Sequence, residues 1–348
     1  MVRKGTLWSL IAVLLVASWA GLGNAREFRD MAGRVHSIPE RISKVFSIGP
    51  SGTVLLYTVD SNLLCGWNYT LKENEKRYIA KALWDLPVLG GWFGKSTGNP
   101  EEIARVDPEV LLSVGSLSPQ RVSFADKIQA QIGIPVIMLD GDLARSPELY
   151  EAMGELTGRG DRCQKLAAFC RETLDLSKAI LAEVPKEQRP TVYYAEGPEG
   201  LNSESGDSRH LQVLFLAGGR NVVPGETTSG RGMKAVTLEQ ILLWNPEIVL
   251  CWSSSRGGAY DVILKDLLWG RLPALRNRRF YEIPQDPFNW FDRPPSVNRI
   301  IGLRWLLGLF YPSRITTPLD QDVASFYELF YGLKLSDKDL EKLLSRAR

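Results

Sequence analysis

The sequence predicts an α/β protein of two Rossmann-like lobes, each with a central parallel sheet, joined by one long rigid α-helix. Two observations predict this fold. A short helix, a proline break and an apolar strand follow one another at residues 100–115, and the same order returns at residues 238–253. Between these stretches, residues 161–184 contain neither glycine nor proline and carry apolar side chains at helical intervals.

The repeated pattern predicts one α/β domain in each half of the chain. The two stretches are identical at the aligned pairs Glu101/Glu239, Ile103/Ile241, Pro108/Pro246, Glu109/Glu247 and Leu112/Leu250. An Asp-Pro or Asn-Pro step stops each helix, because proline disfavours helix in the residue before it. The unbroken Val/Leu/Ile run that follows is typical of a parallel strand covered on both faces. Further short, apolar strands are predicted at residues 43–48, 135–139, 191–195 and 279–283.

The segment between the halves predicts a helix about 35 Å long, at 1.5 Å per residue. Asp161 can cap its start, and Pro185 ends it. Such a helix is a rigid spine and not a flexible hinge. The predicted divisions are a leader at 1–25, an N-terminal lobe at 26–158, the spine at 159–186, a C-terminal lobe at 187–315 and a helical extension at 316–348.

The first residues predict export. Arg3 and Lys4 precede an apolar run from Leu7 to Leu22, and small residues follow at 23–25. The run is about 16 residues, shorter than the roughly 20 that span a bilayer. We therefore expect a cleaved signal peptide and a soluble periplasmic protein. No cysteine follows the run, which argues against a lipid anchor.

Charge and cysteine content exclude several classes of protein. The chain carries a net charge of +2, which the predicted loss of the leader brings to zero, so general nucleic-acid or membrane-surface binding is not expected. The four cysteines form no CxxC pair, which disfavours a structural zinc site. Cys163 and Cys170 lie too far apart on one helix to bridge. We expect buried thiols, although an oxidising compartment leaves a disulfide at Cys65 or Cys251 open.

The order of motifs over residues 40–312 resembles the class III periplasmic binding proteins, which serve ferric siderophores, haem, cobalamin and some oxyanions. The motifs that carry the resemblance lie at 46–51, 64–67, 90–94, 99–103, 106–112, 214–222, 237–242, 245–250 and 272–284. The resemblance implies a ligand cleft between rigidly joined lobes, and delivery to an inner-membrane ABC permease and its ATPase. Many members dock through a glutamate on the first helix of each lobe. Here Val54 and Gln212 stand near those positions, so a different docking contact is expected.

In two facing α/β lobes, ligands bind on the loops after the strands. The residues that follow predicted strands, and that we therefore expect to bind the ligand, are Ser51, Trp67, Asn68, Trp92, Phe93, Ser116, Glu196, Ser208, Arg209, His210, Arg231, Trp252, Asn289, Trp290, Phe291 and Arg293. Arginines bind anionic oxygens and aromatic faces cover apolar rings, which together favour an iron chelate of the ferric siderophore type. A small oxyanion such as molybdate or tungstate, haem and cobalamin are the alternatives.

No intrinsic cofactor is expected. A carrier of bare metal ions needs three or four His, Asp or Glu ligands, and only one of the two histidines, His210, lies in a predicted binding loop. A metal such as iron is therefore expected to arrive within the ligand, where His210 can complete its coordination. An enzyme is not expected, because the chain has no P-loop lysine motif, no HExxH and no GxGxxG after a strand.

Overall fold

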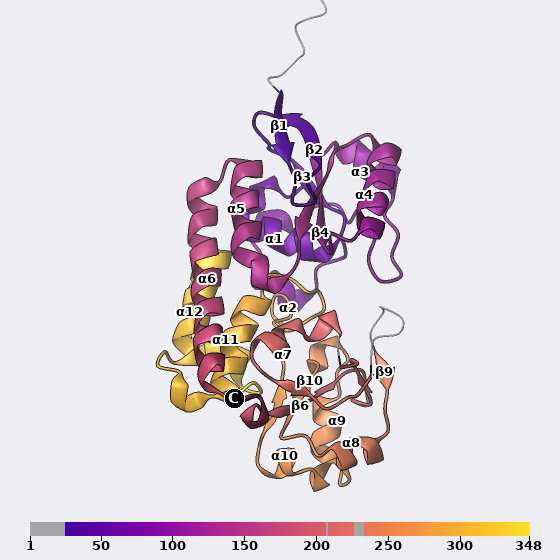
Figure 1. Cartoon of the computed structure of the whole chain (residues 1–348). Coiled ribbons are helices and arrows are strands. Elements are labelled where there is room, and N and C mark those ends of the chain that lie inside the picture. The colour runs from indigo at the N-terminus through magenta and orange to yellow at the C-terminus, as the bar shows by residue number, and fades with distance from the viewer. Residues whose placement is uncertain (1–24, 207, 226–232) are drawn as a thin grey trace, which may run out of the picture.

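The computed structural model describes residues 25–206, 208–225 and 233–348, and it confirms the predicted fold of two α/β lobes joined by a long helix (Figure 1). The predicted leader at 1–25 lies outside the described residues except for Ala25. No helix in the described part of the chain has the length and apolar character needed to cross a membrane.

The N-terminal lobe is built on a three-stranded parallel sheet in the order β3-β4-β5. Its strands are β3 (Val45–Ser47), β4 (Val110–Gly115) and β5 (Val136–Asp140), beside an antiparallel hairpin of β1 (Ala25–Arg29) and β2 (Val35–Pro39). Its helices are α1 (Pro50–Asp60), α2 (Glu73–Lys76), α3 (Pro100–Val106), α4 (Pro119–Ile132) and α5 (Ser146–Thr157).

The C-terminal lobe holds a four-stranded parallel sheet in the order β11-β10-β6-β8. Its strands are β6 (Thr191–Ala195), β8 (Arg220–Asn221), β10 (Ile248–Cys251) and β11 (Phe280–Glu282), beside an antiparallel pair of β7 (Asn202–Ser203) and β9 (Lys234–Ala235). Its helices are α7 (Gln212–Leu216), α8 (Leu238–Trp244), α9 (Tyr260–Lys265) and α10 (Pro273–Arg276).

The internal repeat has a structural reason. In both lobes the residue before the proline, Asp107 or Asn245, ends its helix in the left-handed conformation, with φ of 57° and 48°. Asp and Asn tolerate this region better than other side chains. The repeated glutamate then binds the start of the neighbouring strand. Glu109 Oε2 accepts a hydrogen bond from the backbone N–H of Ser43 at 2.6 Å, and Glu247 Oε2 accepts one from the N–H of Thr191 at 2.7 Å.

The spine is helix α6 (Gly160–Glu183), which lies within the predicted segment 159–186, and Asp161 lies in its first turn and does not cap it. Helices α11 (Arg299–Phe310), α12 (Leu319–Tyr331) and α13 (Asp337–Leu344) follow the C-terminal lobe, and α12 lies beside α6 (Figure 1). Arg304 of α11 donates hydrogen bonds to Thr173 of α6 at 2.8 Å and to Asp322 of α12 at 2.7 Å. These buried contacts fix the spine against the C-terminal helices.

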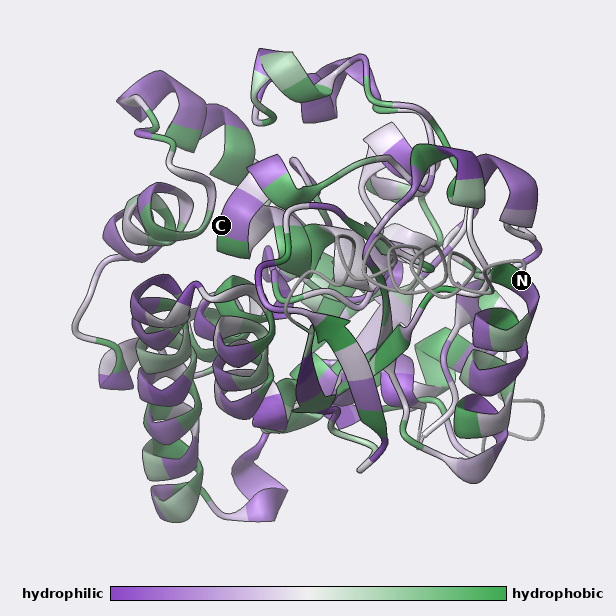
Figure 2. Cartoon of the chain, turned by 90° about the horizontal axis from the view of Figure 1, so that it is seen from above, coloured by the Kyte–Doolittle hydropathy of each residue, from purple (hydrophilic) through white to green (hydrophobic). Residues whose placement is uncertain are grey.

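Hydrophobic and hydrophilic residues alternate along the helices (Figure 2), and the buried apolar residues of both lobes and of α6, α11 and α12 join in one large core cluster. All four cysteines are buried free thiols, so the disulfide left open at Cys65 or Cys251 is absent. Phe330 of α12 packs edge-on against Tyr150 of the N-terminal lobe, at a ring distance of 6.0 Å. The C-terminal extension therefore packs back onto the first lobe.

Candidate functional site

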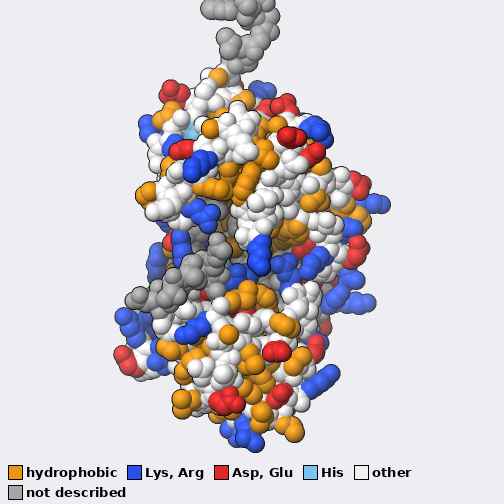
Figure 3. All heavy atoms as spheres, turned by 90° about the vertical axis from the view of Figure 1, so that its right-hand side faces the viewer, with side chains coloured by type: hydrophobic (Ala, Val, Ile, Leu, Met, Phe, Trp, Pro, Cys, Tyr) orange, Lys and Arg blue, Asp and Glu red, His pale blue; other side chains and the backbone are white. Residues whose placement is uncertain are grey.

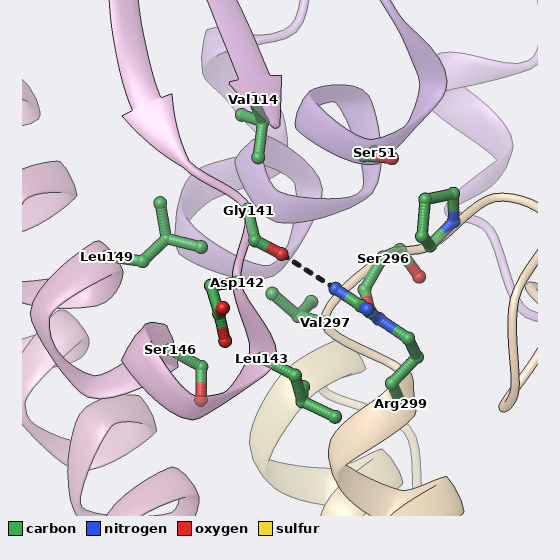
Figure 4. A pocket seen from close by; sticks show the side chains of 11 residues that line it. Ser51, Val114, Gly141, Asp142, Leu143, Ser146, Leu149, Ser296, Val297 and Arg299 are labelled. Carbon is green, nitrogen blue, oxygen red and sulfur yellow. Dashed lines mark hydrogen bonds between the residues drawn. The ribbon is translucent and has the colours of Figure 1, made fainter. Parts of the chain in front are cut away.

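The carboxyl ends of both parallel sheets lead into loops that face the waist between the lobes. In the space-filling view this waist is hollowed, and lysine and arginine side chains gather along it (Figure 3). At its base lies a small hollow with a volume of about 10 Å³, room for about one water molecule. The N-terminal lobe contributes Ser51 and Gly141 to this hollow, and the C-terminal lobe contributes Ser296 and Arg299 (Figure 4).

Arg299 supplies a buried positive charge to the hollow. Its guanidinium donates a hydrogen bond to the carbonyl of Gly141 at 2.8 Å (Figure 4). It also donates to Gln212 Oε1 at 2.8 Å and to the carbonyl of Ser296 at 3.1 Å. Burial lowers the pKa of Arg299 to about 10, so the group stays protonated at neutral pH. Within the described residues, no carboxylate lies within ion-pair distance of it. Its direct partners are neutral, and a bound anion would therefore be favoured.

The N-terminus of α1 reaches the same hollow. Ser51 is the second residue of this helix, and neither a side-chain cap nor an acidic residue occupies its first turn. Helix N-termini offer unpaired N–H groups and a partial positive charge to anions. Arg209 is a second, exposed cation near this hollow. Burial lowers the pKa of Arg299 most, Asp292 and Asp142 oppose that shift, and the nearby charge of Arg209 adds to it. The hollow thus combines the cation Arg299 and a helix N-terminus with one carboxylate, that of Asp142, which accepts a hydrogen bond from Gln212.

A second cluster lies in the C-terminal lobe, around Arg293. Its Nε atom is 3.2 Å from Glu196 Oε1 and 3.1 Å from Asp292 Oδ2, and its Nη2 atom is 2.5 Å from Glu204 Oε1. All three carboxylates are fully buried, whereas the side chain of Arg293 is 27% exposed. Burial opposes the charge of Arg293, but Asp292 and Glu196 outweigh it and raise the pKa. Arg293 is therefore charged at all ordinary pH values.

His210 belongs to this cluster and is oriented by it. Its Nδ1 atom lies 2.6 Å from Asp292 Oδ1, and its side chain is 26% exposed. A buried carboxylate on one ring nitrogen fixes the tautomer and the ring orientation. Nearby, burial raises the pKa of Glu196 to about 8, with Arg293 opposing the shift and Glu204 and Asp292 adding to it.

Several of the predicted aromatic residues lie in the core and not in the cleft. Trp67, Trp290 and Phe291 are almost completely buried. The Trp67 indole donates to the carbonyl of Leu83 at 2.8 Å, and Phe291 packs on Tyr194 at a ring distance of 4.5 Å. Their placement follows from packing, because large apolar rings gain most by leaving water.

The remaining predicted aromatic residues are partly exposed. Trp92 and Phe93 lie in the N-terminal lobe, and the ring of Trp92 covers Gly98 so closely that an added Cβ there would be 2.7 Å from it. Trp252 follows β10 in the C-terminal lobe, with the guanidinium of Arg293 5.8 Å above its ring. These three side chains are the part of the predicted aromatic set available to a ligand.

The predicted asparagines shape loops. Asn68 is buried, and its side-chain amide donates to the carbonyls of Ser47 and Gly90 at 2.8 and 2.7 Å. Asn289 is also buried, and its Oδ1 atom accepts from the backbone N–H groups of Phe291 and Asp292. The second contact holds Asp292 in position beside His210.

The predicted serines Ser116 and Ser208 lie in different surroundings. Ser116 is partly exposed after β4, where its hydroxyl accepts from the N–H of Ser118. Ser208 is buried, and its hydroxyl donates to Glu204 Oε2 at 2.6 Å, so it points to the carboxylate cluster. Arg231 lies outside the described residues.

Residues 94–98 read Gly-Lys-Ser-Thr-Gly and match the G-x-S-x-G pattern of hydrolases. The structure places Ser96 exposed in a turn, where its N–H donates to the carbonyl of Phe93 at 2.8 Å. A nucleophile elbow instead joins a strand directly to a helix. The pattern therefore does not mark such an elbow.

Sequence reasoning missed Glu204 and Arg299. Glu204 follows the two-residue strand β7, which is too short to show a pattern. Arg299 begins the strongly apolar helix α11, where an isolated arginine was the available signal. The two positions considered for importer docking are also unsuited to it. Val54 is buried, and Gln212 is occupied by hydrogen bonds to Arg299 and the N–H of Leu143.

Comparison with known proteins matches residues 69–287 to the model of the periplasmic binding protein family. The chain belongs to this family. It is 24% identical over 355 residues to the molybdate-binding protein MolA of Haemophilus influenzae, covering 92% of this chain and 95% of MolA. Among solved structures, an ABC transporter solute-binding protein from Sulfurospirillum deleyianum is 32% identical, with a TM-score of 0.86 over 92% of this chain and 99% of the other.

Molybdate-bound MolA itself superposes with a TM-score of 0.69 at 21% identity, over 89% of this chain and 99% of that structure. At that identity the likeness shows the fold. The family assignment confirms the resemblance stated from the motifs and makes this chain a solute-binding protein of an ABC transporter.

Proposed function

We propose that this family member captures a small oxyanion of the molybdate and tungstate class between its lobes and delivers it to an inner-membrane ABC permease. The observation that carries the proposal is the buried Arg299, which lines the hollow beside the N-terminus of α1 without a carboxylate at ion-pair distance among the described residues. Charge-assisted donors and helix N-termini are the usual ligands of oxyanions. The full-length likeness to a molybdate-binding protein supports the same class.

The hollow is smaller than such an anion, so binding requires the residues that line it to move apart. The burial of Trp67, Trp290 and Phe291 also weakens the sequence-based preference for a large aromatic-faced chelate, because these rings cannot stack on a ligand. An oxyanion needs no stacking surface.

An anionic metal chelate, the ligand favoured by the sequence, is the second candidate. Its support is the partly exposed set of Trp92, Phe93 and Trp252, which lies on both lobes and includes a ring covered by Arg293. Aromatic faces of this kind suit the organic part of a siderophore, haem or cobalamin.

Isothermal titration calorimetry of the mature protein in EDTA separates the two. We expect saturable binding of molybdate or tungstate and none of ferric siderophores, haem or cobalamin. Arg209→Gln removes an exposed cation near Arg299 and should weaken oxyanion binding by about 2–5-fold, since a solvent-screened charge contributes about 0.2–1 kcal/mol. The control Arg276→Gln changes an exposed arginine of α10, far from the waist (Figure 1), and should bind normally.

Binding of a chelate without any oxyanion would replace the first candidate with the second. No heat with either class of ligand would refute both. Unchanged affinity in Arg209→Gln would show that the charge of Arg209 does not contribute to oxyanion binding.

A further inference from the structure

We propose that Glu204, His210 and Asp292 form a binding site for a divalent transition-metal cation such as Zn²⁺ or Mn²⁺. One potential ligand atom from each of the three residues lies within 4.8 Å of the others. Donors about 2.0–2.2 Å from a common ion are separated by little more than 4 Å at most, so small side-chain adjustments close the site. Nitrogen and carboxylate donors together suit these two metals.

The charges of the cluster are unbalanced. Glu196, Glu204 and Asp292 contribute three carboxylates with no exposed surface, and Arg293 is the cation that contacts all three. Buried charges are costly unless they are paired or bind a metal. Counting Glu204 and Asp292 as carboxylates, Arg293 leaves at least one negative charge uncompensated, and a divalent cation would neutralise it.

Unsatisfied atoms point to the same conclusion. Glu196 Oε2 and Asp292 Oδ2 are buried and accept no hydrogen bond within the described structure, although Asp292 Oδ2 lies 3.1 Å from Arg293 Nε. Glu196 contacts the same nitrogen, Arg293 Nε, through its other carboxylate oxygen, Oε1, at 3.2 Å.

Two members of the cluster are partly exposed to solvent. His210 and Arg293 are about one-quarter exposed, whereas the carboxylates are fully buried. A cation would reach the carboxylates past these two side chains, and three protein donors leave one position of a four-coordinate ion free. The sequence did not suggest this site, because Glu204 and Asp292 lie far apart in the chain and only the fold brings them to His210.

Metal binding is tested with Zn²⁺ or Mn²⁺ alone, on mature protein stripped with EDTA and dialysed free of it. Calorimetry and elemental analysis should show one ion per chain. His210→Ala and Glu204→Gln should each weaken binding by about 10–100-fold or more, the loss typical of removing a metal-site partner. The control Glu239→Gln alters an exposed acid of α8 and should leave binding unchanged.

The Zn²⁺ K-edge absorption spectrum provides a readout that does not depend on variant folding, and it should show one imidazole and a remaining shell of oxygen. Absence of binding at about 100 µM metal, or equal binding by His210→Ala, would show that the cluster is only an ion-pair network around Arg293. The metal titration contains no oxyanion, and the oxyanion titration contains EDTA, so either proposal can fail without the other.

Discussion

Gly302 of α11 is the position where the loop that carries Asp292 and Arg293 passes closest to a helix. A Cβ atom at Gly302 would lie 1.8 Å from the carbonyl oxygen of Trp290 and 2.9 Å from its carbonyl carbon. Both are backbone atoms, so no side-chain rotation can relieve the contact. Gly302→Ala must therefore displace the loop that carries Asp292, which binds His210, and Arg293, which binds Glu204.

The expected magnitude follows from two opposing effects. Alanine in place of glycine stabilises a helix by about 0.5–1 kcal/mol, because the unfolded chain loses freedom. Overpacking in a closed core costs about 1–3 kcal/mol, and more where backbone must move. Gly308 lies in the same helix with open space around it, so Gly308→Ala should show the gain alone. The helix gain is common to both variants, so they should differ by the overpacking cost alone, about 1–3 kcal/mol or more in free energy of unfolding.

Urea denaturation followed by circular dichroism measures both variants against the parent protein. Gly302→Ala should unfold at lower urea, and its affinity for Zn²⁺ or oxyanion should fall as well, because the loop has moved. If Gly302→Ala proved as stable as Gly308→Ala, the close approach of the loop to α11 would be wrong.

Further predictions concern buried charges away from the cleft. Burial raises the pKa of Asp30, but hydrogen bonds, the strongest from His36, lower it overall from 3.8 to about 2. Its ionised form therefore adds about 2.5 kcal/mol of stability at pH 7, about 1.3 kcal/mol at pH 3 and nothing below both pKa values. Asp30→Asn should lower the free energy of unfolding by an amount that decreases as the pH falls from 7 to 3. A loss that is the same at every pH in urea unfolding would contradict the lowered pKa of Asp30. Asp322→Asn should cost about 3 kcal/mol, near the low end for a broken buried pair, because Glu172 still contacts Arg304. Arg304→Met with Asp322→Leu should be nearly neutral, and a double-mutant cycle without coupling would refute the pairing.

The fold was predictable because its signals act over short stretches of chain. The proline steps after Asp107 and Asn245 end α3 and α8, and the apolar runs that follow become β4 and β10. The uninterrupted periodicity at 161–184 becomes α6. Each of these signals depends on backbone geometry within a few residues, so it predicts the element independently of the tertiary packing.

The candidate site was only partly predictable. The segment from Asn289 to Arg293 was expected to line the cleft as a unit, but the structure divides it. Trp290 and Phe291 enter the core, while Asp292 and Arg293 join the carboxylate cluster. Neighbouring residues in an irregular loop have no fixed period, so their directions depend on what they pack against.

The sequence by itself therefore determined two α/β lobes, the rigid helix between them and the family, since hydrophobic periodicity and helix-ending residues are local properties. Only the tertiary structure decided which polar groups meet. Glu204, His210 and Asp292 come together, and Arg299 reaches the N-terminus of α1, because two sheets and their loops fold onto one waist. Burial then fixes their charges and pKa values, and burial is a property of the packed molecule and not of any stretch of sequence.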